Sequence, residues 1–184
     1  MGFWHFVKRV FECFFVHFYS KPTRSVTKMI WEVGFTWLFF GIVIPFYLLH
    51  PDYNDFFFQQ FPFIPQGYIE IIYYLLVVLF VFGEIMNSLC HIHLKSFRKG
   101  DYDYTRQIPI YHGYSFVSGA NYFWEFLSWV AFTLITQTLM SVLFLLITFF
   151  RMNYSAQRKH LRYIAEFKKD YPAEERRAFI PYLF

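Results

Sequence analysis

The chain has 184 residues, of which 57% are hydrophobic, 26% aromatic and 16% charged. Soluble domains usually carry about a quarter charged residues, so the composition excludes a soluble enzyme and a disordered segment and favours a membrane protein. The formal net charge of +4 is local, because residues 151–184 contain eight basic and four acidic side chains. Basic flanks mark the cytoplasmic side of membrane helices, so we interpret this charge as topology and expect no nucleic-acid binding.

Residues 3–19 form the first expected helix, which is aromatic except for one polar stripe. His5, Lys8, Arg9 and Glu12 recur at three- and four-residue spacing, which places them on one face. We pair Lys8 with Glu12 and expect another subunit, or an anionic lipid headgroup, to contact His5 and Arg9. An amphipathic helix lying on the membrane surface is the alternative interpretation.

Two further apolar segments follow, and each is long enough to cross a bilayer. Residues 29–49 and 67–90 contain few charges, and about 20 apolar residues span the hydrocarbon core. Between them, 50–66 contains three prolines and cannot be one regular element. After them, 91–113 is the most polar interior stretch, and we expect it to be a loop.

The last apolar block, 119–154, allows either one tilted span or a hairpin of two short helices. The segments 20–28, 91–113 and 151–184 are basic and 50–66 is acidic. Placing the basic segments on one side of the membrane requires the last block to cross and return. We therefore expect two helices that meet near Thr136-Gln137-Thr138.

These segments predict an all-α integral membrane protein formed by a bundle of about five transmembrane helices. The predicted helices are followed by a basic C-terminal tail, and residues 1–184 form one domain. The expected helices are about 3–19, 29–49, 67–90, 119–136 and 138–156.

Several polar side chains near the helix ends need an explanation, because ionisable groups are costly in a membrane. Residues 87, 91, 95 and 98 share one helical face, residues 121 and 125 are one turn apart, and so are 159 and 163. A cationic cleft with amide and hydroxyl walls would suit a phosphate-bearing cofactor or acyl-CoA. The alternative is that these groups reach the headgroups or bind anionic phospholipid. The histidines show no clear ligand geometry, so no metal is expected.

With their neighbours, these residues form an ordered series of motifs. The series starts with HFVKRVFECFFVHFYS at 5–20 and continues with N-x-x-x-H-x-x-L-x-x-x-R at 87–98. A-N-Y-x-x-E-x-x-S-W follows at 120–129, and K-H-x-x-Y-x-x-E-F-x-x-x-Y-P lies at 159–172. Their order and spacing resemble the C-terminal domain of the steroid 5α-reductase superfamily, nearest the very-long-chain trans-2-enoyl-CoA reductase branch.

The resemblance implies a multi-pass reductase fold that uses NADPH to reduce a double bond conjugated to a carbonyl. It also implies a cofactor site that opens toward the cytosol. With the helical spacing, it gives the candidate cofactor-binding residues Asn87, His91, Arg98, Arg106, Asn121, Glu125, Lys159 and Tyr163.

The chain departs from the family pattern at two tyrosine positions. Phe6 stands where the family has the tyrosine of H-Y-x-K-R, the natural proton donor, and Trp124 replaces a second tyrosine. A phenyl ring cannot donate a proton. Longer relatives also carry membrane helices ahead of this motif, so we expect a shortened relative whose helix 3–19 is covered by other membrane subunits.

The sequence therefore favours a reductase-fold protein that has lost catalysis and serves as an accessory subunit of a larger membrane complex. A respiratory complex of the inner mitochondrial membrane is one such host. The alternative is an active NADPH-dependent trans-2-enoyl-CoA reductase of the endoplasmic reticulum. A lipid- or nucleotide-binding subunit without turnover lies between these two.

Overall fold

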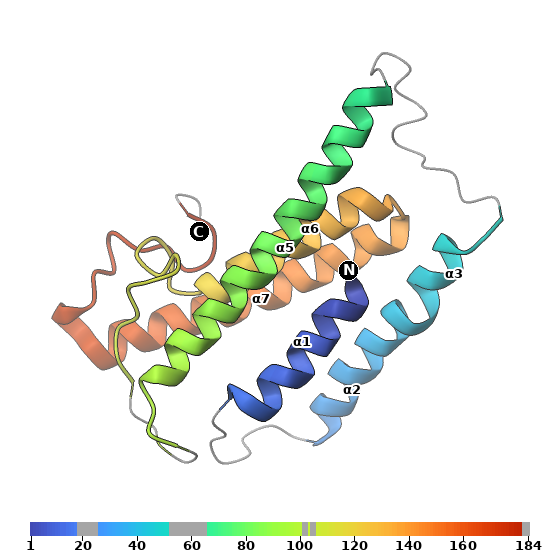
Figure 1. Cartoon of the computed structure of the whole chain (residues 1–184). Coiled ribbons are helices and arrows are strands. Elements are labelled where there is room, and N and C mark those ends of the chain that lie inside the picture. The colour runs from blue at the N-terminus through green and yellow to red at the C-terminus, as the bar shows by residue number, and fades with distance from the viewer. Residues whose placement is uncertain (18–25, 52–65, 101–102, 104–105, 182–184) are drawn as a thin grey trace.

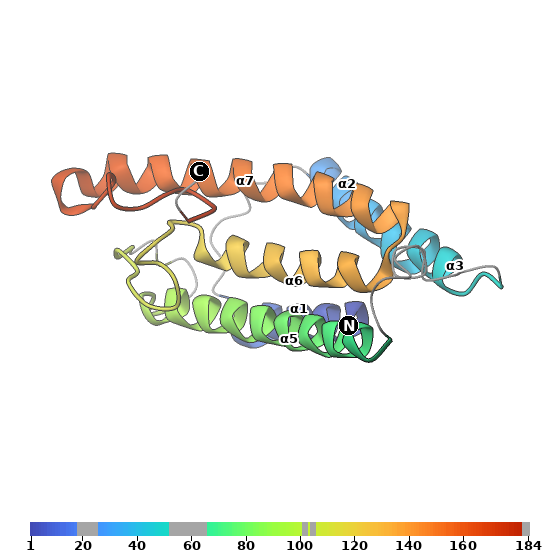
Figure 2. The ribbon, with the colours of Figure 1, turned by 90° about the horizontal axis from the view of Figure 1, so that it is seen from above.

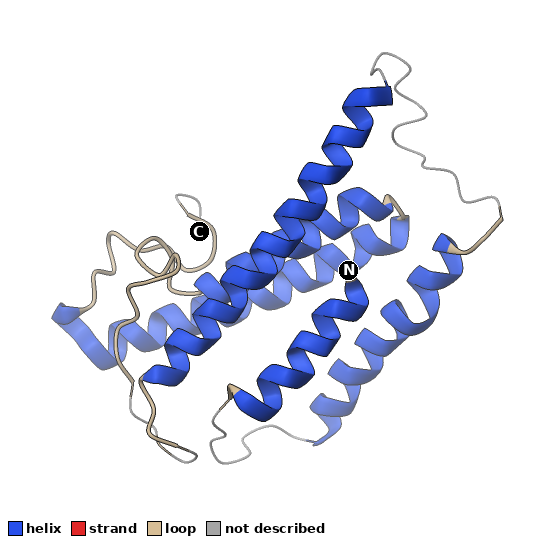
Figure 3. Cartoon of the chain, in the orientation of Figure 1, coloured by secondary structure: helices blue, strands red, loops and turns tan. Residues whose placement is uncertain are grey.

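A computed structural model describes residues 1–17, 26–51, 66–100, 103 and 106–181. Helices dominate this part of the chain (Figure 3), and no strand occurs in it. The one β-type contact among these residues is an isolated parallel bridge between Val117 and Arg177. The predicted all-α class is confirmed.

The helices are labelled in chain order as in Figure 1. They are α1 (Gly2–Phe15), α2 (Val26–Trp37), a π-helical segment (Leu38–Val43), α3 (Ile44–Leu48), α5 (Gln66–Ser96), α6 (Ala120–Thr136), α7 (Leu139–Phe167) and a short 3-10 turn (Lys168–Asp170).

Two helices are longer than the sequence analysis predicted. α5 continues through Ser96, so part of the loop expected at 91–113 is helical. α7 continues to Phe167, so part of the expected tail is also helical. The predicted ends marked where apolar character stops, but the Gln, Arg, Lys and Glu residues in 157–166 are good helix formers and extend α7 beyond its apolar portion.

The block 119–154 is a hairpin of two helices. α6 ends at Thr136, and the left-handed backbone of the next residue, Gln137 (φ 49°), breaks the helical path. Thr138 then caps α7, because its hydroxyl accepts a hydrogen bond from the Ser141 amide at 3.1 Å. These two residues separate α6 from α7, as the hairpin alternative expected.

Two helices in the described ranges are long and apolar enough to cross a membrane. They cover Gly67–Ser96 and Leu139–Asp170. α6 has 17 residues and α1 has 14, which is shorter than the usual span of about 20 residues. The expected count of five transmembrane helices therefore stays a prediction.

The helices pack in layers, with α6 between α5 and α7 and with α1 beside α5 (Figure 2). Gly83 permits the close approach of α5 to α6, because a Cβ there would lie 2.9 Å from the Trp124 carbonyl oxygen. The main apolar core lies between these helices and the π-helical segment with α3, and comprises Ile44, Phe80, Trp129, Ala131, Phe132 and Phe144. This arrangement brings polar side chains of α1 and α5 into contact, and it also connects α5 with α6 and α6 with α7 through hydrogen bonds.

Candidate functional site

The polar stripe of α1 faces α5 inside the chain. His5 is 3% exposed and Glu12 is 2% exposed, whereas Phe3, Trp4 and Phe14 on the outer face are more than two-thirds exposed. His5 and Arg9 both have partners within the chain. The expectation that another subunit or a lipid headgroup contacts them stays a prediction. The helical spacing identified the stripe correctly but could not show what it faces.

The first half of this interface is an ion-pair cluster around Glu84 of α5. The Glu84 carboxylate lies 2.9 Å from His5 Nδ1 and 2.7 Å from Lys8 Nζ. Lys8 Nζ also donates to the Asn87 side-chain oxygen at 2.7 Å. Glu84 thus neutralises the cations of α1.

The second half is a cluster around Glu12 of α1. Its carboxylate accepts from Arg9 at 2.8 Å and from the Ser88 hydroxyl at 3.0 Å. His91 Nδ1 lies 3.5 Å from a Glu12 oxygen and 3.3 Å from His17 Nε2. Glu12, His17 and His91 lie close enough together to hold a metal ion. Arg9 already supplies a positive charge 2.8 Å from the Glu12 carboxylate, so we assign an ion-pair cluster.

A different cluster joins α6, α7 and the turn before α6. Lys159 Nζ donates to the Asn121 side-chain oxygen at 3.1 Å and to the Tyr114 hydroxyl at 3.2 Å. Tyr114 is fully buried, and burial raises the pKa of its phenol well above the usual value. The Tyr114 hydroxyl therefore stays protonated and donates to the same Asn121 oxygen at 3.2 Å.

Asn87 connects the two regions. Its side-chain oxygen accepts from Lys8, and its side-chain nitrogen donates to the Asn121 backbone oxygen at 2.8 Å. Asn87 is fully buried, so both halves of its amide are used inside the chain. The predicted residues Asn87, Asn121 and Lys159 therefore form one connected network.

The remaining predicted cofactor residues lie at different distances from this network. Glu125 is 3.9 Å from His5 Nε2, and His91 belongs to the Glu12 cluster. Tyr163 is buried and its ring lies 5.8 Å from Lys159 Nζ. Arg106 forms an exposed ion pair with Glu166 at 2.7 Å, and Arg98 follows the end of α5.

The two positions that depart from the family pattern provide no hydroxyl group. The Phe6 ring packs edge-on against Phe40, with centroids 5.2 Å apart. Trp124 Nε1 donates to the His112 carbonyl oxygen at 2.8 Å, so its one donor is already used.

Sequence reasoning missed Glu84, Ser88 and Tyr114 as members of the site. Glu84 carried a usable signal, since it is a carboxylate in an apolar helix, three residues before Asn87. Tyr114 lies in a turn and had no periodic signal, because only the fold brings its hydroxyl to Asn121.

A further cluster of polar side chains connects the C-terminal segment to the loop before α6. The Ser118 hydroxyl hydrogen-bonds the Tyr171 hydroxyl and lies 2.6 Å from His160 Nδ1. Burial raises the pKa of Tyr171. The buried Arg176 donates to the Pro109 carbonyl oxygen at 2.8 Å. These contacts hold the loop that carries Tyr114.

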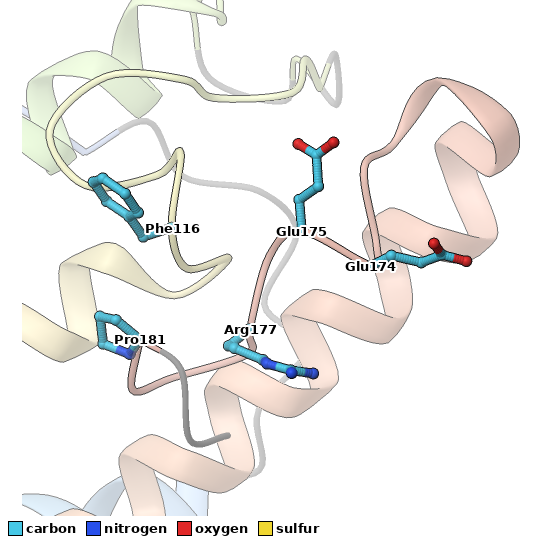
Figure 4. Close-up of a pocket in the computed structure, with 5 residues that line it drawn as sticks. All are labelled: Phe116, Glu174, Glu175, Arg177 and Pro181. Carbon is cyan, nitrogen blue, oxygen red and sulfur yellow. The ribbon is translucent and has the colours of Figure 1, made fainter.

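A pocket of about 200 Å³ lies on this fastened segment, away from the network. Figure 4 shows its lining, which comprises Phe116, Glu174, Glu175, Arg177 and Pro181. Pockets for drug-sized ligands measure about 300–1,000 Å³, so this one is too small for a dinucleotide. It contains none of the predicted site residues.

Comparison with known proteins gives the chain its family. A family model described as 3-oxo-5-alpha-steroid 4-dehydrogenase matches residues 22–184. The chain is 34% identical to a very-long-chain enoyl-CoA reductase of Dictyostelium discoideum over 179 residues, which is 97% of this chain and 55% of the relative. It is 26% identical to the human trans-2,3-enoyl-CoA reductase-like protein, covering 97% of this chain and 47% of that protein.

A steroid reductase is also similar over part of the chain. Human 3-oxo-5-alpha-steroid 4-dehydrogenase 2 is 33% identical over 122 residues, which is 65% of this chain and 46% of that protein. The chain spans about half the length of the curated relatives it matches. The chain belongs to the 3-oxo-5-alpha-steroid 4-dehydrogenase family, with strong similarity to the very-long-chain enoyl-CoA reductases.

Proposed function

We propose that the chain is an NADPH-dependent reductase that saturates the carbon–carbon double bond of a trans-2-enoyl thioester. The observation that carries this proposal is the environment of Lys159, a basic side chain without a carboxylate partner in the described ranges. Its ammonium group is held by two neutral oxygens, on Asn121 and Tyr114. No carboxylate in the described ranges forms an ion pair with it.

A cation held in this way is prepared for an anionic ligand. Burying a charge is costly unless it is paired, and charge-assisted hydrogen bonds to phosphate are among the strong ones. The aromatic rings of Tyr114, Tyr122 and Tyr163 lie 4.7–6.0 Å from Lys159 Nζ and stabilise the cation without neutralising it. A phosphate group would complete the pairing.

The donors present fit a dinucleotide. Lys159 can bind a phosphate oxygen, and Asn121 keeps its side-chain nitrogen for a ligand because its oxygen already accepts two hydrogen bonds. NADPH, when bound, supplies a hydride. The chain's own residues would orient the cofactor and exclude water, and Asn87, which contacts α1 and α6, is already fully buried.

The substrate class follows from the similarity to the enoyl-CoA reductases, which is stronger over this chain than the similarity to the steroid reductase. For an active reductase we propose the endoplasmic reticulum membrane. The inner mitochondrial membrane belongs to the accessory-subunit hypothesis alone.

A turnover assay tests the proposal. The chain in lipid nanodiscs is mixed with NADPH and a long-chain trans-2-enoyl-CoA, and the saturated acyl-CoA is measured by mass spectrometry. We expect product formation in step with NADPH oxidation. Absence of product at saturating NADPH and substrate would contradict the proposal.

A second candidate function is the non-catalytic accessory subunit. The environments of Phe6 and Trp124 favour it, since Phe6 lacks a hydroxyl group and the indole donor of Trp124 is engaged. The same assay separates the two proposals. An inactive wild type that gains activity on Phe6→Tyr would support the accessory subunit, because the rest of the site would then be intact.

A further inference from the structure

The imidazole ring of His5 lies between two carboxylates. It is next to Phe6, which stands where the family pattern has a tyrosine. His5 Nδ1 is 2.9 Å from Glu84 Oε1, and His5 Nε2 is 3.9 Å from Glu125 Oε1. The ring packs against Trp129, with centroids 4.5 Å apart. We propose that His5 is the proton donor of the reaction, an inference that rests on the proposed reductase function.

The contacts of His5 fix which nitrogen can act. Nδ1 donates to Glu84, which orients the ring, as a carboxylate does for a catalytic imidazole. Nε2 is too far from Glu125 for a hydrogen bond. The Nε2 proton is therefore free to reach a substrate atom near Glu125.

His5 lies next to the network assigned to the cofactor. Its partner Glu84 is three residues before Asn87 on α5, and Glu125 is four residues after Asn121 on α6, so each pair shares a helix face. Burial of His5 to 3% exposure separates its proton from bulk water. Exclusion of water from an active site limits side reactions of a reactive intermediate.

The reaction balances with His5 as the acid. NADPH, when bound, would supply a hydride to the β-carbon, which would leave an enolate of the thioester for His5 to protonate. The His5 Nε2–H bond breaks, and its proton forms the new C–H bond at the α-carbon. Neutral His5 then regains a proton from solvent through Lys8, which bonds Glu84 at 2.7 Å and is 18% exposed.

The kinetic test compares the wild type with His5→Gln, Phe6→Tyr and the double variant. Glutamine can still donate to Glu84 but has no titratable proton. We expect His5→Gln to lower kcat by about 10²–10⁴-fold while the Kd for NADPH stays unchanged. Phe6→Tyr in that background should restore at least part of kcat, since it returns a proton donor. His50→Gln, at an exposed position, is the matched control.

A second readout does not depend on turnover. NMR of ¹⁵N-labelled histidine should show the His5 Nδ1 proton in a strong hydrogen bond to Glu84, and this bond should weaken in Glu84→Gln. The charged side chains around the His5 ring and its partner are Glu84, Glu125 and Lys8. This NMR measurement tests the role of His5 even if the His5→Gln variant fails to fold.

The outcomes distinguish the two proposals. An active wild type with unchanged kcat in His5→Gln, or a His5 Nδ1 that forms no hydrogen bond to Glu84, overturns the role of His5 and leaves the reductase function standing. A wild type without turnover overturns both.

Discussion

The two polar regions of the molecule differ in how their charge is balanced. At the interface of α1 and α5, the carboxylates of Glu84 and Glu12 neutralise Lys8 and Arg9 directly. Between α6 and α7, Lys159 is held by neutral oxygens instead. A self-neutralised cluster contributes to stability and can move protons, whereas an unbalanced cation is suited to bind an anion. We therefore expect mutations in the first region to affect stability and mutations in the second to affect ligand binding.

The largest effect on stability is expected from Glu84→Ala. It removes the nearest carboxylate of both Lys8 and His5, and breaking a buried ion pair costs about 3–5 kcal/mol. At about 2–4 °C per kcal/mol, Tm should fall by roughly 10 °C. Melting followed by circular dichroism in detergent measures this. Glu70→Ala, at an exposed position of the same helix, is the control and should leave Tm within about 2 °C.

An intermediate effect is expected from Gly83→Ala, which disturbs the spacing of the helices that carry both regions. The new Cβ would meet the Trp124 carbonyl oxygen at 2.9 Å and the Ser128 side chain. Overpacking of this kind costs about 1–3 kcal/mol. Gly67→Ala on the same helix meets nothing within 4 Å and should be neutral or stabilising by up to about 1 kcal/mol. Equal melting curves for the two variants would contradict the close approach of α5 and α6.

The smallest effect is expected at the exposed ion pair of Arg106 and Glu166. Their side chains are 34% and 37% exposed, and such pairs contribute about 0.2–1 kcal/mol. A double-mutant cycle with Arg106→Ala and Glu166→Ala measures the coupling, which should weaken at high salt. A coupling energy above about 2 kcal/mol would mean that this exposed pair stabilises the protein as much as a buried pair does, and would contradict the prediction.

Much of this architecture follows from patterns in the sequence. Periodic spacing predicted one polar face on α1, and charge asymmetry favoured the hairpin that Gln137 and Thr138 form. The polar stripe of α1 was recognised, but its contact with α5 was not, because periodicity shows which residues share a face and not what covers it. Only tertiary packing links Lys8 to Glu84 across 76 residues.

The site was predictable where its residues belong to spaced motifs. Asn87, Asn121 and Lys159 come from three motifs and form one network. Tyr114 could not be predicted, since a turn has no periodicity and its hydroxyl gains a partner only when α6 and α7 pair.

The most direct test of the account is the affinity for NADPH of the wild type and of Lys159→Met, measured by energy transfer from tryptophan to the bound nicotinamide. Loss of a charge-assisted hydrogen bond costs about 1.5–3 kcal/mol, so the Kd should rise by about 10–100-fold. Tm should change little, because the cation has no carboxylate partner to strand. Lys169→Met, at an exposed position, should bind as the wild type does. Equal affinity in Lys159→Met, or no saturable binding by the wild type, would contradict the assignment of Lys159 as the anion-binding cation.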